Sequence, residues 1–353
     1  MKTIDEVIQT ITAPDEEARR AAEARWSTIA MPLGGLGIFE EMITRIAALR
    51  GSPDFRLDRR TLLVFCSDNG VVAEGVTQCG SEVTARVAAA LAEDRGTASV
   101  LARSSGCRVI PVDEGMLNFP GHPGVRNMRV RNGTGNISVE PAMKKKECLK
   151  AMAGGAELVE ELALEGTDIL AVGEVGIGNT TTATALAAAL LGLDPEEVTG
   201  RGAGLSTEGL SRKKAAIRRA MERCRAGADD PVGLIAELGG LDIAAMCGAF
   251  LSAATYRIPV IVDGVISATA ALCAKRLCPE AEAAMLASHV SSEPLGRLLL
   301  NELGLSAPLD AGMHLGEGSG ALMLMSLLQM VLDVYSSGQS FERLGIEAYQ
   351  PLD

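Results

Sequence analysis

A single carboxylate stands between glycines near the end of the chain, in the run HLGEGSGALML, residues 314–324. Glycine on both sides of Glu317 lets the backbone approach a ligand closely, and the apolar run that follows predicts a buried helix. Water is scarce at such a position, so burial should raise the pKa of Glu317 toward the range of a useful general base. An N-terminal cap is the alternative role, but capping does not need a glycine on each side. The turn therefore predicts a catalytic base.

Two glycine-rich loops could hold an anion. The segment DILAVGEVGIGNTTTATALAAALLG, residues 168–192, reads as a strand, a loop and a helix. Glycines before a helix N-terminus expose backbone N–H groups and the positive end of the helix dipole. The loop lacks the Gly-Lys-Ser/Thr of a P-loop and the spacing of the dinucleotide fingerprint, and a tight turn with Asn/Thr capping is the alternative. We favour anion binding, because a second segment, TGRGAGL at residues 199–205, follows and leads to Arg212, Lys213 and Lys214.

A cation close to two glycine loops is a candidate phosphate partner in a chain of net charge −12. Solvation at the surface is the default for at least one of the two lysines. Other polar residues are weaker candidates. Arg126, Arg129 and Arg131 alternate as residues on a solvated edge do, and His289 lies near two serines, Ser291 and its neighbour, that could cap a helix or hold a phosphate.

Short apolar runs alternate with Ala-rich stretches after residue 60. The runs TLLVFCSDNG, CRVIPVDEG, DILAVGEVGIGN and IPVIVDGVIS end in Gly, Asp or a similar turn residue, which predicts an α/β fold with a parallel sheet. The start of the chain reads as helices, and the run LMLMSLLQMVLDVY should be buried against them. Ligands bind at the carboxyl ends of parallel strands. The acids placed there form a group of site candidates: Asp68, Asp113, Glu174 and Asp263.

Composition excludes several classes of function. The 353 residues are 47% hydrophobic, enough for one large core or two unequal ones. The acidic balance, with no Lys/Arg run longer than residues 144–146, argues against a nucleic-acid or anionic membrane partner. No leader or apolar stretch of about 18 residues is visible, so we expect a cytoplasmic protein that contacts no membrane. The eight cysteines contain no C-x-x-C and the three histidines are scattered, so neither a disulfide framework nor a metal site is expected.

Several stretches together resemble one family, the nicotinate-nucleotide:dimethylbenzimidazole phosphoribosyltransferases, which make the lower-ligand nucleotide of cobalamin. GEVGIGNTTTATAL is similar to the family's G-E-M-G-I-G-N-T-T, and GRGAGLSTEGLSRK follows its G-R-G-x-G-L…R-K. DNGVVAEGVT, GVRNMRVRNGTGNISVEPAM and LGEGSGAL resemble further family segments in the family's order. The match spans most of the chain from residue 30 to 330. A long ordered set of this kind is more specific than any single glycine motif.

The resemblance implies a Rossmann-like parallel sheet flanked by helices over residues 56–324. It also implies a small helical domain built from both chain ends, residues 1–55 and 325–353, and a homodimer; a hetero-oligomer with a paralogue stays open. The implied reaction takes nicotinate mononucleotide and an aromatic base, releases nicotinate, and needs no cofactor.

The resemblance also implies roles for individual residues. Glu317 would be the general base and Glu174 a second acid in the pocket. The residues expected to hold the phosphoribosyl and nicotinate groups are Gly176, Gly178, Asn179, Thr180, Gly202, Lys213, Asp263, Ser291, Gly316 and Gly318. The residues expected at the base pocket are Asp68, Gln78, Cys79, Gly80, Ser81 and His314.

The base pocket is where the sequence departs from the family. The family carries Ser-Ala-Tyr-Pro-Gln before Glu-Val-Thr, whereas residues 77–81 read TQCGS, and Asn69 replaces a histidine. Losing a stacked ring removes roughly 0.5 to 1.5 kcal/mol beyond burial. We therefore predict an altered base choice: unsubstituted or polar benzimidazoles, a purine, or a phenol that attacks through oxygen. The alternative is that the standard base is still preferred.

The sequence disfavours two functions of other classes. A Rossmann-type oxidoreductase is disfavoured by the missing dinucleotide fingerprint. A non-catalytic subunit that supports a related chain is disfavoured because the sequence keeps Glu317, Glu174 and Lys213.

Overall fold

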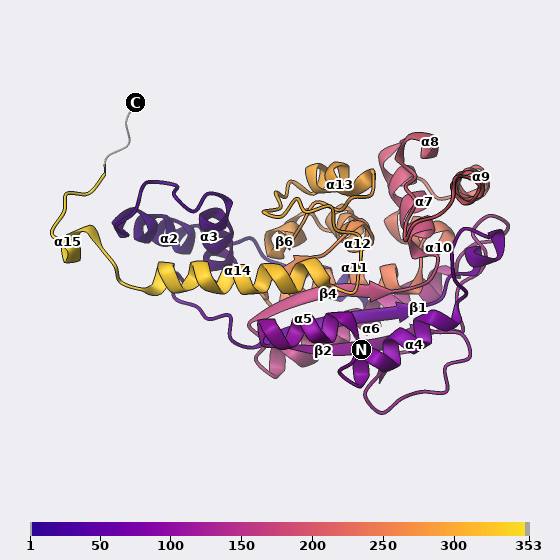
Figure 1. The fold of residues 1–353 in the computed structure, drawn as a ribbon, viewed down its shortest axis with the longest axis horizontal. Helices are drawn as coiled ribbons and strands as arrows, with labels where there is room; N and C mark the ends of the chain where they lie inside the picture. Colours follow the sequence, from indigo (N-terminus) through magenta and orange to yellow (C-terminus); the bar gives the residue numbers. More distant parts are fainter. Residues whose placement is uncertain (1, 350–353) are drawn as a thin grey trace.

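The computed structural model describes residues 2–349, which form a three-layer α/β fold around a six-stranded sheet of order β3-β2-β1-β4-β5-β6 (Figure 1). All neighbouring strands pair in parallel. The strands are β1 (Arg60–Ser67), β2 (Cys107–Gly115), β3 (Arg126–Asn127), β4 (Ile169–Val175), β5 (Val260–Val262) and β6 (Met285–Ala287). The expected fold class is confirmed. The four apolar runs form β1, β2, β4 and β5, while the short β3 and β6 were not predicted.

The central strands are apolar because helices cover both faces of the sheet. All of β4 and all but the first residue of β1 are buried, as expected for parallel strands between two helical layers. One face shares its hydrophobic core with α1 (Ile4–Ile8), α6 (Lys145–Leu164), α7 (Asn179–Leu191), α8 (Pro195–Val198), α9 (Thr207–Arg223), α10 (Pro231–Leu238), α11 (Leu241–Thr255), α12 (Val265–Leu277) and α13 (Leu295–Leu303).

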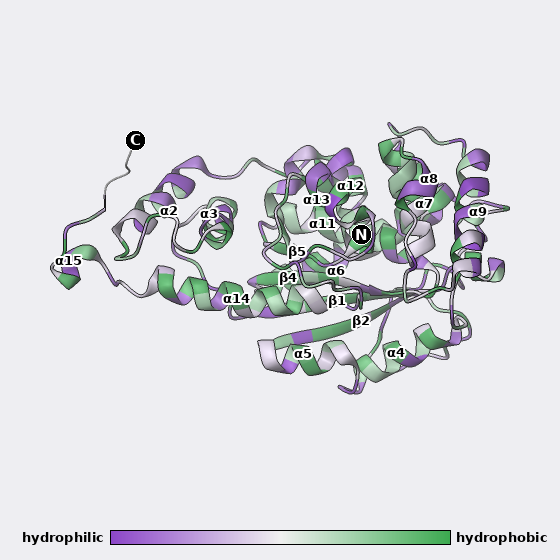
Figure 2. Cartoon of the chain, turned by 45° about the horizontal axis from the view of Figure 1, so that its top comes forward, coloured by the Kyte–Doolittle hydropathy of each residue, from purple (hydrophilic) through white to green (hydrophobic). Residues whose placement is uncertain are grey.

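The second face shares a separate core with α2 (Glu16–Thr28), α3 (Ile38–Arg50), α4 (Glu82–Ala92), α5 (Thr97–Ser105) and α14 (Ser319–Ser336). Short 3-10 turns, η1 (Gly70–Glu74) and η2 (Pro279–Ala284), and a last helix, α15 (Phe341–Leu344), complete the elements. Figure 2 shows α4 and α5 on one side of the sheet and α11 and α12 on the other.

Helix α14 connects the sheet to the N-terminal helices. It contacts β4 and α5 near its start and α3 farther along, and Figure 1 shows it, in yellow, running toward α2 and α3. The rings of Trp26 in α2 and Tyr335 in α14 lie 4.8 Å apart. The expectation that this helix packs against the N-terminal helices is confirmed. The division into residues 56–324 and the two chain ends stays a prediction, although α1, from the first range, contacts α6 and α11 instead.

By length and composition alone, α14 is the one helix of residues 2–349 that could cross a membrane. In the structure 56% of it is buried, and a core helix of a soluble protein meets the same criteria. The buried part of its apolar surface is therefore accounted for by the core on the second face of the sheet.

Candidate active site

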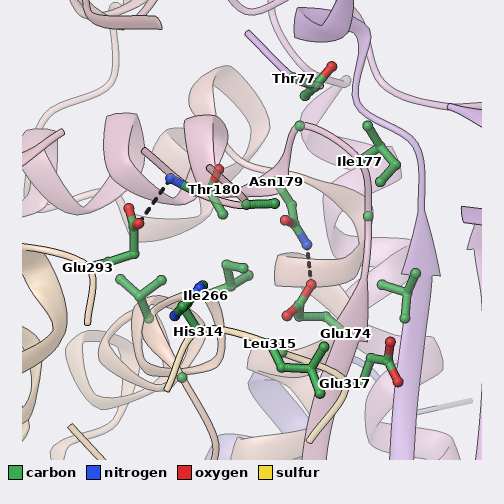
Figure 3. Close-up of a pocket in the computed structure, with 18 of the residues that line it drawn as sticks. Thr77, Glu174, Ile177, Asn179, Thr180, Ile266, Glu293, His314, Leu315 and Glu317 are labelled. Atoms are coloured by element: carbon green, nitrogen blue, oxygen red, sulfur yellow. Dashed lines mark hydrogen bonds between the residues drawn. The ribbon is translucent and has the colours of Figure 1, made fainter. Parts of the chain in front are cut away.

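A cavity of about 340 Å³ opens at the carboxyl ends of the strands. β1 and β4 lie side by side there, and the chain continues from them toward opposite edges of the sheet, since β2 lies beyond β1 and β5 beyond β4. Ligands of doubly wound sheets bind at such a switch point. The wall comes from loops that follow β1, β4, β5 and β6 and from the turn before α14 (Figure 3).

Twelve of the residues expected at the site line this cavity: Gln78, Cys79, Glu174, Gly176, Gly178, Asn179, Thr180, Gly202, Ser291, His314, Gly316 and Glu317. Six do not line it: Asp68, Gly80, Ser81, Lys213, Asp263 and Gly318. The tertiary structure thus collects residues from widely separated segments and places several of the expected contacts behind the wall.

Glu317 stands in a turn of left-handed backbone. Its φ is 58°, and those of Gly316 and Gly318 are 80° and 76°. Positive φ is uncommon for a residue with a side chain and is often found at functional sites. The glycines also permit close packing, because a Cβ on Gly316 would lie 2.6 Å from Glu174 Oε1, and one on Gly173 would overlap the backbone of residue 318. The turn therefore rests directly on β4.

The carboxylate of Glu317 is half-buried at the cavity wall. The backbone N–H of Ala98, in the first turn of α5, donates to Oε2 at 3.2 Å, and no protein group within residues 2–349 donates to Oε1. Burial raises the pKa of Glu317, and the Ala98 hydrogen bond opposes that rise. Oε1 is therefore available to accept a proton, as a general base requires.

Asp263 holds the Glu317 turn rather than lining the cavity, which corrects the expected direct contact with the substrate. Its buried carboxylate accepts hydrogen bonds from the backbone N–H groups of Gly318 at 3.2 Å, Gly320 at 2.8 Å and Ala321 at 3.1 Å. Burial raises the pKa of Asp263 to about 7, against the opposing effect of these hydrogen bonds. Asp263 therefore joins the end of β5 to the start of α14.

Replacing Asp263 with asparagine is expected to lower turnover while leaving the binding of the mononucleotide nearly unchanged. The NH2 group of asparagine would face a backbone N–H group from which Asp263 now accepts a hydrogen bond. A buried donor without an acceptor lowers stability by roughly 1 to 3 kcal/mol. The melting temperature should fall with turnover. The exposed Asp310, paired with Arg297 at 2.7 Å, offers a control in Asp310→Asn, which should change neither quantity. Normal turnover in Asp263→Asn would contradict the positioning role.

Glu174 is linked through Asn179 to a second buried acid, Asp242. Asn179 Nδ2 donates one hydrogen to Glu174 Oε2 and one to Asp242 Oδ2, the latter at 3.1 Å. Burial, and then the negative charge of Asp242, raise the pKa of Glu174 well above its usual range. The protonated form of Glu174 is therefore favoured relative to that of an exposed glutamate. Sequence reasoning assigned no role to Asp242; its signal is a lone acid at the start of the apolar run LDIAAMCGAFLSAA.

Lys213 lies behind the cavity wall, neither solvated nor in the lining. Its side chain is 0% exposed, and Nζ donates to Thr180 Oγ1 at 2.9 Å. A Cβ on Gly202 would lie 3.4 Å from this Nζ, so Lys213 also sits directly beneath Gly202. Burial lowers the pKa of Lys213 to about 8, with Glu293 opposing the shift. The cation that the sequence analysis expected at a phosphate therefore contacts Thr180 and lies beneath Gly202, two residues that do line the cavity.

The other strand-end acids are occupied by protein groups. Asp68 accepts hydrogen bonds from Thr84 Oγ1 at 2.6 Å and from Leu117 N at 2.7 Å. Asp113 is paired with Arg129 at 2.7 Å. Among the four acids grouped by position, only Glu174 reaches the cavity. Asp68, expected at the base pocket, therefore does not line the cavity and bonds to protein groups instead.

The loop that carries the unusual TQCGS segment covers one side of the cavity. Gln78 Nε2 donates to Ala203 O at 3.0 Å, which links this loop to the second glycine-rich loop. Cys79 lines the cavity, whereas Gly80 and Ser81 lie outside it at the start of α4. Valine, isoleucine and leucine dominate the apolar wall, and none of the Phe, Tyr or Trp residues between 2 and 349 line it. The expected loss of an aromatic wall is therefore not compensated within this part of the chain.

Residues 2–349 contain no group of three or more His, Cys, Asp or Glu side chains that could hold a metal ion. We assign no residue to a metal or a cofactor.

Comparisons with known proteins agree with this geometry. A family model described as "Phosphoribosyltransferase" matches residues 11–346. The nicotinate-nucleotide–dimethylbenzimidazole phosphoribosyltransferase of Ruminiclostridium cellulolyticum is 38% identical over 99% of the chain and 100% of its own length. The enzyme of the same name from Halalkalibacterium halodurans is 38% identical over 98% and 97%.

Two solved structures from Thermus thermophilus share the fold. One, named nicotinate-nucleotide–dimethylbenzimidazole phosphoribosyltransferase, has a TM-score of 0.88 at 36% identity and covers 94% of this chain and 99% of its own. The other, named CobT, has a TM-score of 0.90 at 37% identity over 94% and 100%.

Proposed function

The chain belongs to the phosphoribosyltransferase family, and we propose that it transfers the 5-phosphoribosyl group of nicotinate mononucleotide to an aromatic lower-ligand base. The membership confirms the reaction class expected from the sequence, and it does not favour a non-catalytic partner subunit. The observation that carries the substrate proposal is Glu317, held by left-handed backbone at the wall of the switch-point cavity.

The proposed reaction forms one C–N bond and breaks another at C1′ of the ribose. One azole nitrogen of the base attacks C1′ as the bond to the pyridinium nitrogen breaks, and the bonding electrons return to the ring. Nicotinate leaves with a neutral ring, so its departure needs no acid. Glu317 Oε1 takes the proton from the other azole nitrogen. Attack opposite the leaving group inverts the anomeric centre from β to α, which gives an α-ribosyl nucleotide.

The glycine loops are proposed to hold the phosphate of the mononucleotide. Helix α7 begins at Asn179 directly after Gly178, so its N-terminal N–H groups and the positive end of its dipole lie beside the cavity. Thr180 and Ser291 add hydroxyl groups to this wall, and the cation of Lys213 lies behind Thr180. Orientation of the ribose between this site and Glu317 is the protein's main contribution to the rate.

We also propose a homodimer in the cytoplasm. An apolar stripe remains exposed on α14, formed by Met323, Met330 and Val334 at 40%, 64% and 38% exposure. Residues seven and four positions apart share one face of a helix, and such a face is typical of a protein contact. Sedimentation equilibrium should give twice the monomer mass, and Met330→Lys should reduce it.

Incubation with nicotinate mononucleotide and a mixture of 5,6-dimethylbenzimidazole, benzimidazole, adenine and p-cresol tests both the reaction and the choice of base. Chromatography should show nicotinate together with a ribosyl nucleotide of at least one base. Because residues 2–349 give the cavity no aromatic wall, its preference for the dimethylated base should be roughly two- to tenfold weaker than that of a pocket in which an aromatic ring stacks on the base. Cys79→Tyr should strengthen that preference, and Cys79→Ser is the control. A strong preference for 5,6-dimethylbenzimidazole in the unmodified protein would contradict the altered choice.

A further inference from the structure

His289 is a buried titratable residue at the cavity wall that the proposed mechanism does not use. It follows β6 and is only 4% exposed, yet it lines the cavity. Its Nδ1 lies 3.0 Å from Ser288 Oγ. No group within residues 2–349 forms a hydrogen bond with Nε2, although this atom is not sealed from the cavity as the orphaned polar atoms of the core are.

The neighbours of Ser288 determine which ring nitrogen carries the proton. Ser288 Oγ lies 2.9 Å from Val262 O and 3.1 Å from Asp263 O. Carbonyl oxygens only accept, so the single hydroxyl hydrogen of Ser288 is shared by these two groups. Contact with Nδ1 is then a hydrogen bond only if His289 donates from Nδ1. Asp263 Oδ1, at 4.0 Å, also lies on the Nδ1 side and favours a proton there.

The ring is also fixed in position. A Cβ on Gly320, in the first turn of α14, would overlap Nδ1, and one on Gly264 would lie 3.7 Å from Nε2. Glycine backbone therefore borders the imidazole on both sides. Burial lowers the pKa of His289, which favours the neutral ring. His289 thus presents one fixed lone pair, on Nε2, to the cavity.

Few groups of the proposed substrates can donate to such a lone pair. The carboxylate of nicotinate mononucleotide carries no proton at neutral pH, its pyridinium nitrogen has none, and its phosphate is mainly an acceptor. The N–H of the base is taken by Glu317 in the proposed reaction. The remaining donors are the 2′- and 3′-hydroxyl groups of the ribose.

We propose that Nε2 of His289 accepts a hydrogen bond from a ribose hydroxyl of the mononucleotide and so orients C1′ toward the base. This inference rests on the proposed function for the identity of the substrate. The bond would lie between the segments after β5 and β6 and the start of α14, close to the turn that carries Glu317. The ribose would therefore be held at the same end of the cavity as the base catalyst.

The test is a double-mutant cycle that combines a substitution in the protein with the removal of a hydroxyl group from the substrate. Wild type and His289→Ala are compared with nicotinate mononucleotide and with its 2′-deoxy and 3′-deoxy analogues, by kcat/KM and by titration calorimetry. With wild type, kcat/KM and affinity should be roughly three- to tenfold lower for one deoxy analogue than for nicotinate mononucleotide. With His289→Ala, the same analogue and the mononucleotide should give equal values. The other analogue should lose the same factor with both proteins. His289→Gln keeps an acceptor and should restore part of the difference between the mononucleotide and that analogue. Ser288→Ala should reduce the same difference.

Two controls separate this proposal from general damage and from the proposed function. His122→Ala, on a partly exposed loop histidine away from the cavity, should leave every ratio unchanged. Equal losses on deoxygenation in wild type and His289→Ala would overturn the inference, as would a loss confined to the KM of the base. If the protein binds nicotinate mononucleotide but turns over none of the bases, only the proposed function is contradicted, because calorimetry still measures the effect of each hydroxyl group on binding. Failure of wild type to bind the mononucleotide would overturn both.

Discussion

Replacing Glu317 with glutamine is expected to lower kcat roughly a hundredfold or more, the usual scale for the loss of a general base. The amide keeps the size of the side chain but cannot take the azole proton. In wild type, burial raises the pKa of Glu317, so the rate should rise with pH through a value above the usual range of a glutamate. Glu317→Gln should lack this rise and should still bind nicotinate mononucleotide, measured by calorimetry.

A matched control for this change is Glu342→Gln, because Glu342 is exposed on α15. Its rate and pH profile should equal those of wild type. Near-normal turnover of Glu317→Gln at neutral pH would exclude Glu317 as the base. Glu174, which lies in the same cavity, would then be the next residue to replace.

Replacing Lys213 is expected to weaken the binding of nicotinate mononucleotide roughly tenfold and to leave the binding of the base unaffected. A direct charge-assisted contact contributes roughly 1.5 to 3 kcal/mol, and the lower end of this range is expected because Lys213 supplies its charge from behind Thr180 and Gly202. The pKa of Lys213 is lowered to about 8, and a lysine is charged below its pKa. The kcat/KM for the mononucleotide should therefore fall in wild type as pH rises through about 8, and Lys213→Met should lack this fall.

Methionine is the informative substitution because Lys213 is fully buried and alanine would leave a void. Lys214→Met is the control, since Lys214 pairs with Glu196 at 3.4 Å and does not line the cavity. If only the apparent affinity for the base changes in Lys213→Met, the phosphate is held by the α7 N-terminus without help from Lys213.

The parallel sheet and the glycine turn around Glu317 could be predicted because their signals are local. Short apolar runs rich in Val, Ile and Leu identify strands that are buried between two helical layers, and β1 and β4 are of this kind. Strands β3 and β6 contain two and three residues and read RN and MLA, whereas the equally short β5 stands in the Val/Ile-rich run IPVIV, which made it visible in the sequence. The glycines around Glu317 likewise show in the sequence the backbone conformation that the structure contains.

The strand-end acids show where local signals stop. Asp68, Asp113 and Asp263 are the same residue type near the carboxyl ends of strands: Asp68 and Asp263 directly follow β1 and β5, and Asp113 lies two residues before the end of β2. Their roles differ because Thr84, Arg129 and the first turn of α14 reach them from distant parts of the chain. No spacing in the sequence distinguishes them from Glu174.

By itself, the sequence determined the fold class, the reaction class and the identity of Glu317 as the candidate base, because hydrophobic runs, glycine turns and ordered motifs are properties of contiguous residues. The tertiary structure decided which polar groups face the cavity. It placed Lys213 behind Thr180 and turned Asp263 toward α14. It also left Nε2 of His289, at the cavity wall, without a hydrogen-bond partner among residues 2–349. Burial and hydrogen-bond partners depend on residues far apart in the chain, so they are settled only when the segments pack together.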